Sequence, residues 1–533
     1  MGKEAKPIKV EKKSADATIN LALDTIAMGK QALVFVNTKR SAERVAEDLS
    51  KKTGIKEAAL ERLGEFVHTS LPRPTKQCER LARCIKGGVA FHHAGLVAEQ
   101  REAIEDAFRD NTVRIICCTP TLAAGVDLPA FRTIIRDVRR YTGRGMTFIP
   151  VLEYLQMAGR SGRPSFDKKG EAIIVTNNEE EKETLTERYI HGDPEEIYSK
   201  LAVEPVLRTY LLSLIASGFI TSISSMIAFF SKTFWAHQYE DPDALTAKLM
   251  ATLDLLEEWE FVIQNGDKNP TSNEPAFVSA DQLTAEGNDK LRTTLMGKRI
   301  SQLYLDPLTA YQLIERIRRT TTVKFDTFGL LHAFSYTLEM RPLLHMRNAD
   351  FEMVEDALAT HEENMLEKEP SMASIDIDEF YDSVKTALFL SEWIEEKDEE
   401  YLLEKYAVRP GETRVKISTA DWLLFAMSEI AKIMSYRDLA KPLANLRTRL
   451  KYGAREELLP LLRIRNIGRV RARKLFFHGI KDAGSLRRTD KATLTQLLGK
   501  ATATTIKVQL GQEDGSVEVP KNKRRGQISL EDW

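Results

Sequence analysis

Short apolar runs alternate with amphipathic segments over the first third of the chain. Runs rich in β-branched residues occupy positions 31–37, 88–94, 113–120, 131–138 and 170–176. Apolar residues at helical spacing lie between them at 41–49, 99–110 and 149–159. Strands too apolar to be half-exposed, alternating with helices, are typical of a parallel sheet covered on both faces. The pattern predicts one α/β domain over residues 1–184.

The strand pattern nearly disappears after residue 185. Helices followed by a short strand pair at 261–266 and 277–287 predict a winged-helix domain over 185–299. Helical spacing with acidic surfaces continues over 300–440, and a helix–turn–helix break centred on Gly468 lies in a further predicted domain over 441–515. We expect residues 516–533 to be a disordered tail, so the fold class is α/β followed by mostly α-helical domains.

Charge is distributed unevenly along a chain whose net charge is −1. Residues 441–480 carry eleven lysines and arginines against two acids, whereas EEKDEE (395–400) has the opposite bias. A basic block in a neutral protein indicates a local anion site, often for nucleic acid. A solvated helix face is the other interpretation of this block.

The four cysteines do not indicate a metal site. Cys78, Cys84, Cys117 and Cys118 form no C-x-x-C pair, so we expect no zinc. Cys117 and Cys118 lie in an apolar run, as expected of reduced thiols in a buried strand, and a cytoplasmic location follows. The chain shows no signal peptide and no apolar run near 18 residues, and LRTYLLSLIASGFI (207–220) reads as a core helix.

Polar loops follow several of the predicted strands. FVNTKRSAE (35–43), FHHAGL (91–96) and CTPTLAAGVDLPA (118–130) each end or follow a strand, and QMAGRSGRP (156–164) enters the same edge. Ligands of such sheets bind beyond the carboxyl ends of the strands. In QMAGRSGRP two arginines stand three apart, and guanidinium groups bind phosphate oxygens bidentately. The loops predict one composite site that includes a phosphate.

In this order the four stretches resemble the second RecA-like motor domain of superfamily 2 helicases. The match is closest to the archaeal Ski-like DNA repair helicases, relatives of the helicase part of DNA polymerase theta. It covers nearly the whole chain, and IGRVRARKL (467–475) is as strong a match as the motor motifs. The resemblance implies a 3′-to-5′ DNA helicase, driven by ATP with Mg²⁺, that unwinds forked or lagging-strand duplexes in replication restart and repair.

The resemblance also implies roles for individual residues. Gln156, Arg160 and Arg163 match the last motor motif, whose arginines reach across a cleft to ATP as arginine fingers. A structural salt-bridge pair is the alternative for the two arginines. The nucleotide side of the motor would further include Gly125, Asp127 and Gly159, and the residues near the DNA backbone would be Asn37, Thr38, His92, Thr119 and Thr121.

The sequence departs from the family at the nucleotide pocket. It contains no G-x-x-x-x-G-K-[ST] loop to cradle phosphates and no D-E-x-H box to hold magnesium. DEFY (378–381) and DEEY (398–401) lie in the helical region, where we expect surface acids. A first motor domain must therefore come from another polypeptide or from a longer chain, and we expect no ATP hydrolysis by these residues alone.

Two segments are candidates for contacts with the DNA strands. DVRRYTGRGMTF (137–148) predicts a β-hairpin, and in relatives a hairpin here pries the duplex open, which would place Arg139, Arg140 and Tyr141 near the split. An ordinary solvent hairpin is the alternative. In the helix predicted over 380–396, the resemblance suggests a ratchet helix in which Trp393 stacks on a base, worth about 1–3 kcal/mol, and Lys385 touches the backbone. A core position is the alternative for Trp393.

The last two motifs are near the end of the chain. IRNIGRVRARKL (464–475) resembles a helix-hairpin-helix, with Ile467-Gly468 at the tight turn and free N–H groups beyond it. Arg469, Arg471 and Arg473 would add attraction for DNA that does not depend on base sequence. Gln527, Leu530 and Trp533 resemble the box that docks replication proteins on the sliding clamp, although the usual box ends in two aromatic residues.

Two other functions remain open from the sequence. One is a non-catalytic DNA-binding adaptor recruited to the sliding clamp, in which the motor motifs are relics. The other is an RNA helicase of the same superfamily. The helix-hairpin-helix and the clamp-like tail favour DNA.

Overall fold

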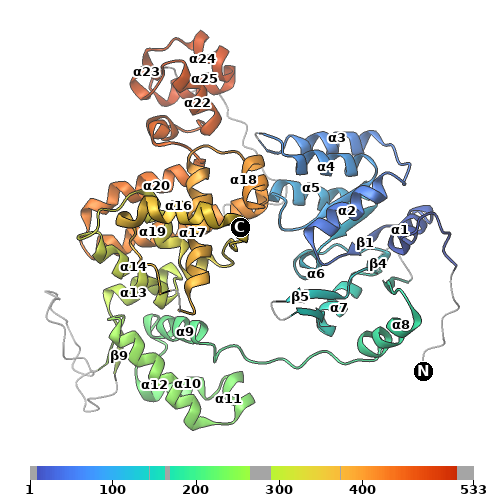
Figure 1. The fold of residues 1–533 in the computed structure, drawn as a ribbon, viewed down its shortest axis with the longest axis horizontal. Helices are drawn as coiled ribbons and strands as arrows, with labels where there is room; N and C mark the ends of the chain where they lie inside the picture. The colour runs from blue at the N-terminus through green and yellow to red at the C-terminus, as the bar shows by residue number, and fades with distance from the viewer. Residues whose placement is uncertain are drawn as a thin grey trace, which may run out of the picture. The chain divides into compact units, whose positions relative to one another are not determined.

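The computed structural model describes residues 9–512, apart from residues 72, 143–144, 163–168, 265–289 and 372–373. The described chain forms two compact units (Figure 1). The first, here called the motor unit, comprises the residues up to Leu207, Ser224–Met250 and Asp398–Lys416. The second, here called the helical unit, comprises Arg208–Ile223, Ala251–Lys397 and the residues from Ile417 onwards. The region predicted as a winged helix is thus shared between the two units.

A five-stranded parallel sheet is the centre of the motor unit. Its order is β2-β3-β1-β4-β7, and every neighbouring pair is parallel. The strands are β1 (Ala32–Phe35), β2 (Val89–His92), β3 (Ile115–Cys118), β4 (Arg132–Ile135) and β7 (Glu171–Ile174). All residues of β1 to β4 are buried, as an apolar parallel strand requires when both faces are covered. The five predicted strands and the parallel sheet are confirmed.

Helices surround this sheet. The three predicted ones are present as α2 (Lys39–Ser50), α5 (Ala98–Arg109) and α7 (Val151–Ala158). The others of the first 190 residues are α1 (Ala17–Ala27), α3 (Ala58–His68), α4 (Lys76–Lys86), α6 (Thr121–Gly125), α8 (Glu179–Leu185) and the π-helix η1 (Thr186–Ile190). In α4 the buried residues Cys78, Leu81, Ala82 and Ile85 recur at helical spacing, so the signal for this helix is in the sequence.

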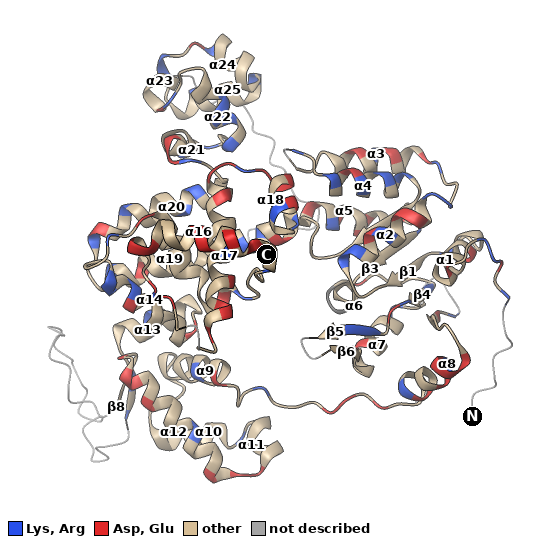
Figure 2. Cartoon of the chain, viewed as in Figure 1, with Lys and Arg blue, Asp and Glu red and all other residues tan. Residues whose placement is uncertain are grey.

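The predicted hairpin is also present. Strands β5 (Arg139–Thr142) and β6 (Gly145–Phe148) pair antiparallel, with Arg139 opposite Phe148. Part of β5 is blue in Figure 2, because Arg139 and Arg140 belong to this strand. Because this ribbon contributes no strand to the central sheet, its side chains stay largely exposed.

The region after residue 185 is mainly helical, as predicted. Its early helices are α9 (Glu204–Ala216), α10 (Ile223–Phe230), α11 (Phe234–Tyr239) and α12 (Pro242–Glu258). Strand β8 (Val262–Gln264) confirms the first strand of the predicted pair, and it pairs antiparallel with β9 (Leu291–Thr293). The second strand was predicted at 277–287, which lies outside the described residues.

The region from 300 to 440 is helical, and red segments in Figure 2 mark acidic residues on α16 and α17. Its helices are α13 (Leu295–Leu303), α14 (Pro307–Arg319), α15 (Thr327–Ser335), α16 (Phe351–His361), α17 (Ile377–Ile394), α18 (Glu399–Tyr406), α19 (Pro410–Ile433) and α20 (Ala440–Tyr452). Among the acids expected at the surface, Glu399 is instead 4% exposed.

A small separate core holds the last described helices together. They are α21 (Leu459–Leu462), α22 (Arg469–Phe477), α23 (Ala483–Arg488), α24 (Lys491–Leu498) and α25 (Lys500–Gln509). Leu461, Ile467, Leu475 and Ile506 belong to this core. The turn before α22 differs from the expectation, because the left-handed residue is Asn466 (φ 67°), while Gly468 is extended and caps α22.

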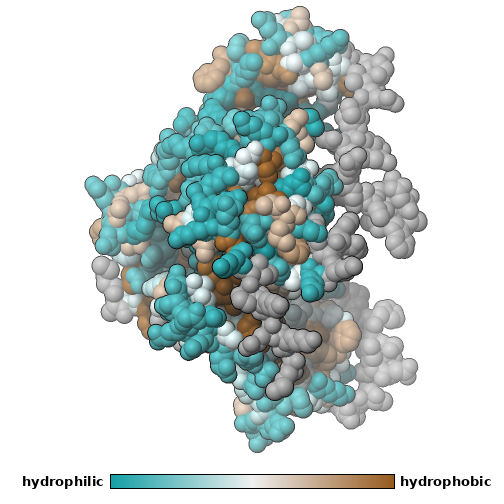
Figure 3. All heavy atoms as spheres, turned by 90° about the vertical axis from the view of Figure 1, so that its right-hand side faces the viewer, coloured by the Kyte–Doolittle hydropathy of each residue, from teal (hydrophilic) through white to brown (hydrophobic). Residues whose placement is uncertain are grey.

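The four cysteines are free and buried, as the apolar run around Cys117 and Cys118 predicted. None of the helices in the described ranges is long and apolar enough to cross a membrane. On the face drawn in Figure 3, hydrophilic side chains predominate and apolar ones form smaller patches.

Candidate nucleic-acid and nucleotide site

A cavity of about 910 Å³ lies on the motor unit, where the loops that follow β1 and β3 meet α7. The structure brings six of the predicted site residues to its wall: Asn37, Thr38, Thr119, Thr121, Arg140 and Gln156. Predicted residues from Asn37 to Gln156, far apart in the sequence, therefore line one site. The parallel sheet is the cause, because it collects the carboxyl ends of its strands at one edge.

Hydrogen bonds orient the polar side chains of this wall. Thr38 caps α2 by accepting a hydrogen bond from the Ser41 N–H at 3.0 Å. The hydroxyl groups of Thr119 and Thr121 lie 2.9 Å apart. The side-chain amide of Asn37 donates to the carbonyl of Arg139, which ties the loop after β1 to the hairpin. The residues are thus held in place before any ligand binds.

The cavity wall is basic. It includes Lys39, Arg40, Arg140 and Arg409, whereas Glu153 is its one carboxylate among the lining residues. Glu153 pairs with Arg140 at 2.9 Å and offsets that charge. Lys39 and Arg409 also have carboxylate partners outside the wall, Glu412 and Glu43. Cationic side chains beside hydroxyl and amide groups suit a phosphate-bearing ligand.

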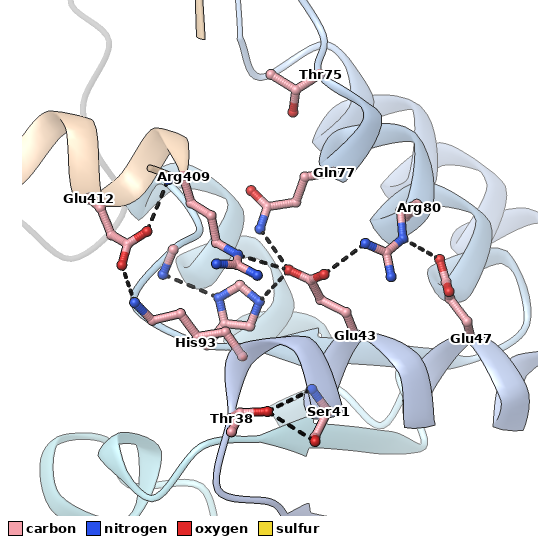
Figure 4. A network of polar contacts seen from close by, with 12 residues as sticks. Thr38, Ser41, Glu43, Glu47, Thr75, Gln77, Arg80, His93, Arg409 and Glu412 are labelled. Atoms are coloured by element: carbon pink, nitrogen blue, oxygen red, sulfur yellow. Dashed lines mark hydrogen bonds and ion pairs between the residues drawn. The ribbon is translucent and has the colours of Figure 1, made fainter. Parts of the chain in front are cut away.

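Behind the wall, a buried carboxylate joins four segments (Figure 4). Glu43 of α2 is 3% exposed. It accepts hydrogen bonds from Arg80 at 2.7 Å, Gln77 at 3.2 Å and Arg409 at 3.1 Å, and His93 Nε2 lies 3.2 Å away. Removing any one cation would leave this carboxylate less compensated, and buried charges are stable only when paired.

The surroundings determine the ionisation of this cluster. Burial alone would raise the pKa of Glu43, but the contact from His93 and the charge and hydrogen bond of Arg409 outweigh it and lower the pKa to about 2. Burial lowers the pKa of His93, although Glu43 opposes this effect. Near neutral pH the cluster therefore contains an ionised Glu43 and a neutral His93.

The residues predicted for the nucleotide lie beside this cavity. The Arg160 guanidinium donates to the carbonyl of Ala123, and its Nη1 is 3.5 Å from Asp127. Gly159 ends α7 and Gly125 ends α6, whereas Arg163 lies outside the described residues. The Asp127 contact matches the salt-bridge alternative, but the Asp127 side chain is 94% exposed, so the pair is not a buried one.

These residues fit one side of an ATP site. Arg160 offers a cation and Gln156 an exposed amide, yet neither builds a loop of N–H groups around a triphosphate. Within the described ranges, no three His, Cys, Asp or Glu side chains gather closely enough to hold a metal ion. The cations present can stabilise phosphate oxygens.

Other predicted DNA-binding residues differ in their exposure. His92 is 4% exposed and its Nε2 lies 2.9 Å from Glu105, so the ring contributes to the core rather than to the cavity wall. In the hairpin, the Arg139 guanidinium lies over the Phe148 ring at 4.3 Å, while Tyr141 is 75% exposed. The hairpin thus presents an aromatic ring to solvent, which fits both a strand-separating hairpin and the alternative of an ordinary solvent hairpin.

In the helical unit, the two predicted residues of α17 are buried. Trp393 is 5% exposed, and its indole N–H donates to the Leu450 carbonyl at 2.7 Å. The Lys385 ammonium is paired with Asp350 at 2.6 Å. In this conformation Trp393 occupies a core position, which was the alternative to base stacking. Lys385 is not available to a DNA backbone, because its ammonium is buried and paired with Asp350.

The arginines around Gly468 are partly engaged. Arg473 pairs with Glu396 and with Glu457, the latter at 2.7 Å, and the Arg469 guanidinium lies 4.8 Å from the centre of the Trp393 ring. Arg471 donates to the Asn466 carbonyl at 2.7 Å and remains exposed. Of the three, Arg471 has the charge most accessible to a phosphate. The clamp-like residues Gln527, Leu530 and Trp533 lie outside the described residues.

Sequence reasoning missed the residues of the cavity that come from far along the chain. Arg409 lies about 370 positions after Thr38, and Glu43 and Gln77 were not singled out. The one local signal is the Pro-Gly pair at 410–411, which marks a break before α19 but does not reveal what the preceding arginine contacts.

Comparisons with known proteins match three parts of the chain to family models. The helicase conserved C-terminal domain matches residues 66–165, a helix-turn-helix domain matches residues 170–263, and domain 4 of archaeal helicases matches residues 328–453. The first match covers part of the cavity wall, and the third contains both Arg409 and Trp393.

Proteins similar to this chain include several that are named ATP-dependent DNA helicase Hel308. The protein from Pyrococcus horikoshii is 37% identical over 510 residues, covering 94% of this chain and 67% of that protein. The one from Methanococcus vannielii is 36% identical, covering 87% and 63%, and the one from Methanocella arvoryzae is 35% identical, covering 96% and 67%. The chain spans about two thirds of the length of these relatives.

Proposed function

The chain belongs to the family of the archaeal Hel308 helicases, and from this premise we propose that it is the part of an ATP-dependent DNA helicase that completes the motor and guides DNA. One observation carries the proposal. The motor unit brings Gln156 to the wall of a basic cavity and holds Arg160 beside it, on an edge to which several strand-end loops contribute. The alternative of a non-catalytic adaptor is not favoured, since the relatives bear the name of an ATP-dependent enzyme.

The proposed chemistry gives Arg160 the role of an arginine finger. A guanidinium next to the transferring phosphoryl group stabilises the charge that spreads over its oxygens in the transition state. The contact with Ala123 and Asp127 holds Arg160 without burying it, so its guanidinium can exchange the exposed carboxylate for phosphate oxygens. Arg163 would contribute a second cation. ATP with Mg²⁺ would be held mainly by a first motor domain, in a second chain or in a longer form of this one, so we expect no ATP hydrolysis by this chain alone.

The DNA side of the proposal uses the cavity and the hairpin. Asn37, Thr38, Thr119 and Thr121 would contact the backbone of one strand through hydroxyl and amide groups. Tyr141 at the exposed hairpin would stand where the strands separate. Arg471 would add a phosphate contact in the helical unit, and stacking by Trp393 remains a prediction that requires its ring to be uncovered.

The finer features of the helicase are proposals that follow from the resemblance. They are 3′-to-5′ movement, action on forked or lagging-strand DNA during replication restart and repair, kinship with the helicase part of polymerase theta, a cytoplasmic location and docking of the tail on the sliding clamp.

Reconstitution of ATP turnover tests the proposal. We expect the pure chain to bind single-stranded DNA and to hydrolyse no ATP. Adding the portion of the Pyrococcus horikoshii protein that this chain does not cover should give DNA-stimulated hydrolysis. Arg160→Ala should then lower turnover by about 10³-fold, the usual range for an arginine finger, while leaving DNA binding unchanged.

Arg109→Ala is the matched control, because Arg109 is an exposed arginine of the same unit that pairs only with neighbours on its own helix. It should leave turnover unchanged. ATP hydrolysis by the pure chain would contradict the proposal, because the chain would then hold a complete nucleotide pocket.

A further inference from the structure

Arg409 is an unexpected member of the cavity wall. It lies between α18 and α19 in a part of the chain that matches a helical domain of the family, yet Asp398–Lys416 belongs to the motor unit. Its side chain is 19% exposed and lines the cavity together with Thr38, Thr119 and Thr121. The segment thus supplies a cation to a wall whose other lining residues all come from the first 160 positions of the chain.

Close backbone contacts hold this segment in place. The Gly411 N–H donates to the Gly95 carbonyl at 3.0 Å, and a side chain on Gly411 would collide with the carbonyls of Ala94 and Leu96. Glu412 adds an ion pair with Lys39 and accepts a hydrogen bond from the Arg409 N–H at 2.9 Å. Arg409 is therefore placed by contacts on both sides of its own backbone.

Only one side of the Arg409 guanidinium makes a hydrogen bond to the described residues. Its Nε donates to Glu43 at 3.1 Å, while the two terminal nitrogens make no hydrogen bond or ion pair within the described part of the chain (Figure 4). Glu43 is already compensated by Arg80 on its other oxygen at 2.7 Å. A guanidinium fixed through Nε, with its terminal pair free at a basic cavity, has the geometry that binds phosphate oxygens bidentately.

We propose that Arg409 is a DNA-binding residue of the motor unit that contacts a backbone phosphate of the single strand in this cavity. The inference rests on the proposed function and deepens it. Glu43 acts as the positioning residue, since it fixes the Nε side of the guanidinium and leaves the other side to the phosphate. The 398–416 segment therefore contributes directly to the strand-binding surface, besides packing against it.

The salt dependence of DNA binding tests the inference. Binding of a fluorescent oligo(dT) single strand by the 533-residue chain is measured over a range of salt concentrations. Each phosphate contact contributes about 0.7 to the slope of log affinity against log salt for single strands. We expect Arg409→Gln to lower that slope by about 0.7, and Arg409→Lys, which keeps the charge, to preserve it.

Arg414→Gln is the matched control. Arg414 is an exposed arginine of α19, the helix that begins directly after Arg409, and it does not line the cavity. Arg414→Gln removes the same charge as Arg409→Gln and should leave the slope of log affinity against log salt unchanged. A folded Arg409→Gln protein with the wild-type slope would overturn the inference, as would an equal loss in Arg414→Gln, which would indicate a general charge effect.

Two further variants separate failure of the inference from failure of the proposed function. If Arg40→Gln lowers the slope and Arg409→Gln does not, the cavity binds DNA and only the role of Arg409 is wrong. If both leave the slope unchanged while Arg471→Gln lowers it, the cavity is not a strand site, and both the inference and that part of the proposed function are wrong. A wild-type chain that does not bind the oligonucleotide would also overturn both.

A measurement on the unmodified protein covers the case in which Arg409→Gln does not fold. Phenylglyoxal modifies accessible arginines, and peptide mass spectrometry reads the extent at each position. We expect oligo(dT) to protect Arg409 but not Arg414. Equal modification of Arg409 with and without the oligonucleotide would contradict the inference.

Discussion

The roles of several charged residues in this protein depend on the partners that compensate their charge. Glu43 stays ionised inside the motor unit because three side chains donate to it, and Lys385 is buried because Asp350 pairs with it. The sequence indicated Lys385 as a DNA contact, whereas the fold uses its charge internally. Arg409, by contrast, lines a cavity, so residue type alone does not predict which cations reach a cavity wall.

Substitution of Glu43 is expected to change the acid sensitivity of the motor unit. Because the pKa of Glu43 is lowered from 4.5 to about 2, its stabilisation is complete above about pH 4.5 and is lost as the pH falls towards 2. Glu43→Gln should cost about 3 kcal/mol of unfolding free energy at pH 7, and the difference from wild type should narrow as the pH falls. Urea unfolding at pH 7, 5 and 3 measures this. A difference that does not vary with pH would contradict the role of the ionised carboxylate.

Elements of this chain end where backbone conformation and packing require it. Helix α20 ends at Gly453, which has a left-handed φ of 61°, and a Cβ there would lie 2.6 Å from the Trp393 ring. The sequence predicted the long helix around Trp393 but not the neighbour that covers its ring. Likewise the hairpin was predicted from its glycine-rich tip, whereas its attachment to Asn37 depends on a strand a hundred positions earlier.

The glycine that ends α20 is expected to be sensitive to substitution. Gly453→Ala combines the cost of a left-handed alanine with a collision against Trp393, so we expect a loss of about 2–4 kcal/mol. Gly479→Ala is the control, since Gly479 has a φ of 77° but open space around it. It should cost about 1 kcal/mol. Thermal unfolding of both variants, followed by circular dichroism, compares the two, and equal losses would show that the Trp393 contact adds nothing.

The whole molecule divides into two compact units that do not follow the order of the chain. The motor unit includes Ser224–Met250 and Asp398–Lys416, whereas Arg208–Ile223, which directly precedes Ser224, belongs to the helical unit. A boundary at a single position, such as the predicted ones at 184 or 299, cannot describe this arrangement. Segments that are distant in the sequence join one unit because an apolar or charged surface packs against its complement wherever the fold places it.

Two units with separate cores are expected to unfold in separate transitions. Urea unfolding of the wild-type chain should give two steps, since each unit has its own buried core. Glu43→Gln should move only the step of the motor unit, and Gly453→Ala only that of the helical unit. Tryptophan fluorescence follows the unfolding of the helical unit through Trp393, whereas far-ultraviolet circular dichroism follows the unfolding of both units. A single cooperative step moved equally by both variants would contradict independent unfolding.

Local sequence patterns predicted the five parallel strands, the hairpin, the helical character of the later chain and the motifs that meet at the sheet edge. These follow from local periodicity and from the rule that parallel strands present their carboxyl ends together. Only the tertiary structure decided that Trp393 and Lys385 are buried, that His92 faces Glu105, and that Arg409 joins the cavity. Burial and ion pairing depend on neighbours that the fold brings together, 57 positions away for Trp393 and Leu450 and 366 for Arg409 and Glu43, and no local pattern encodes such proximity.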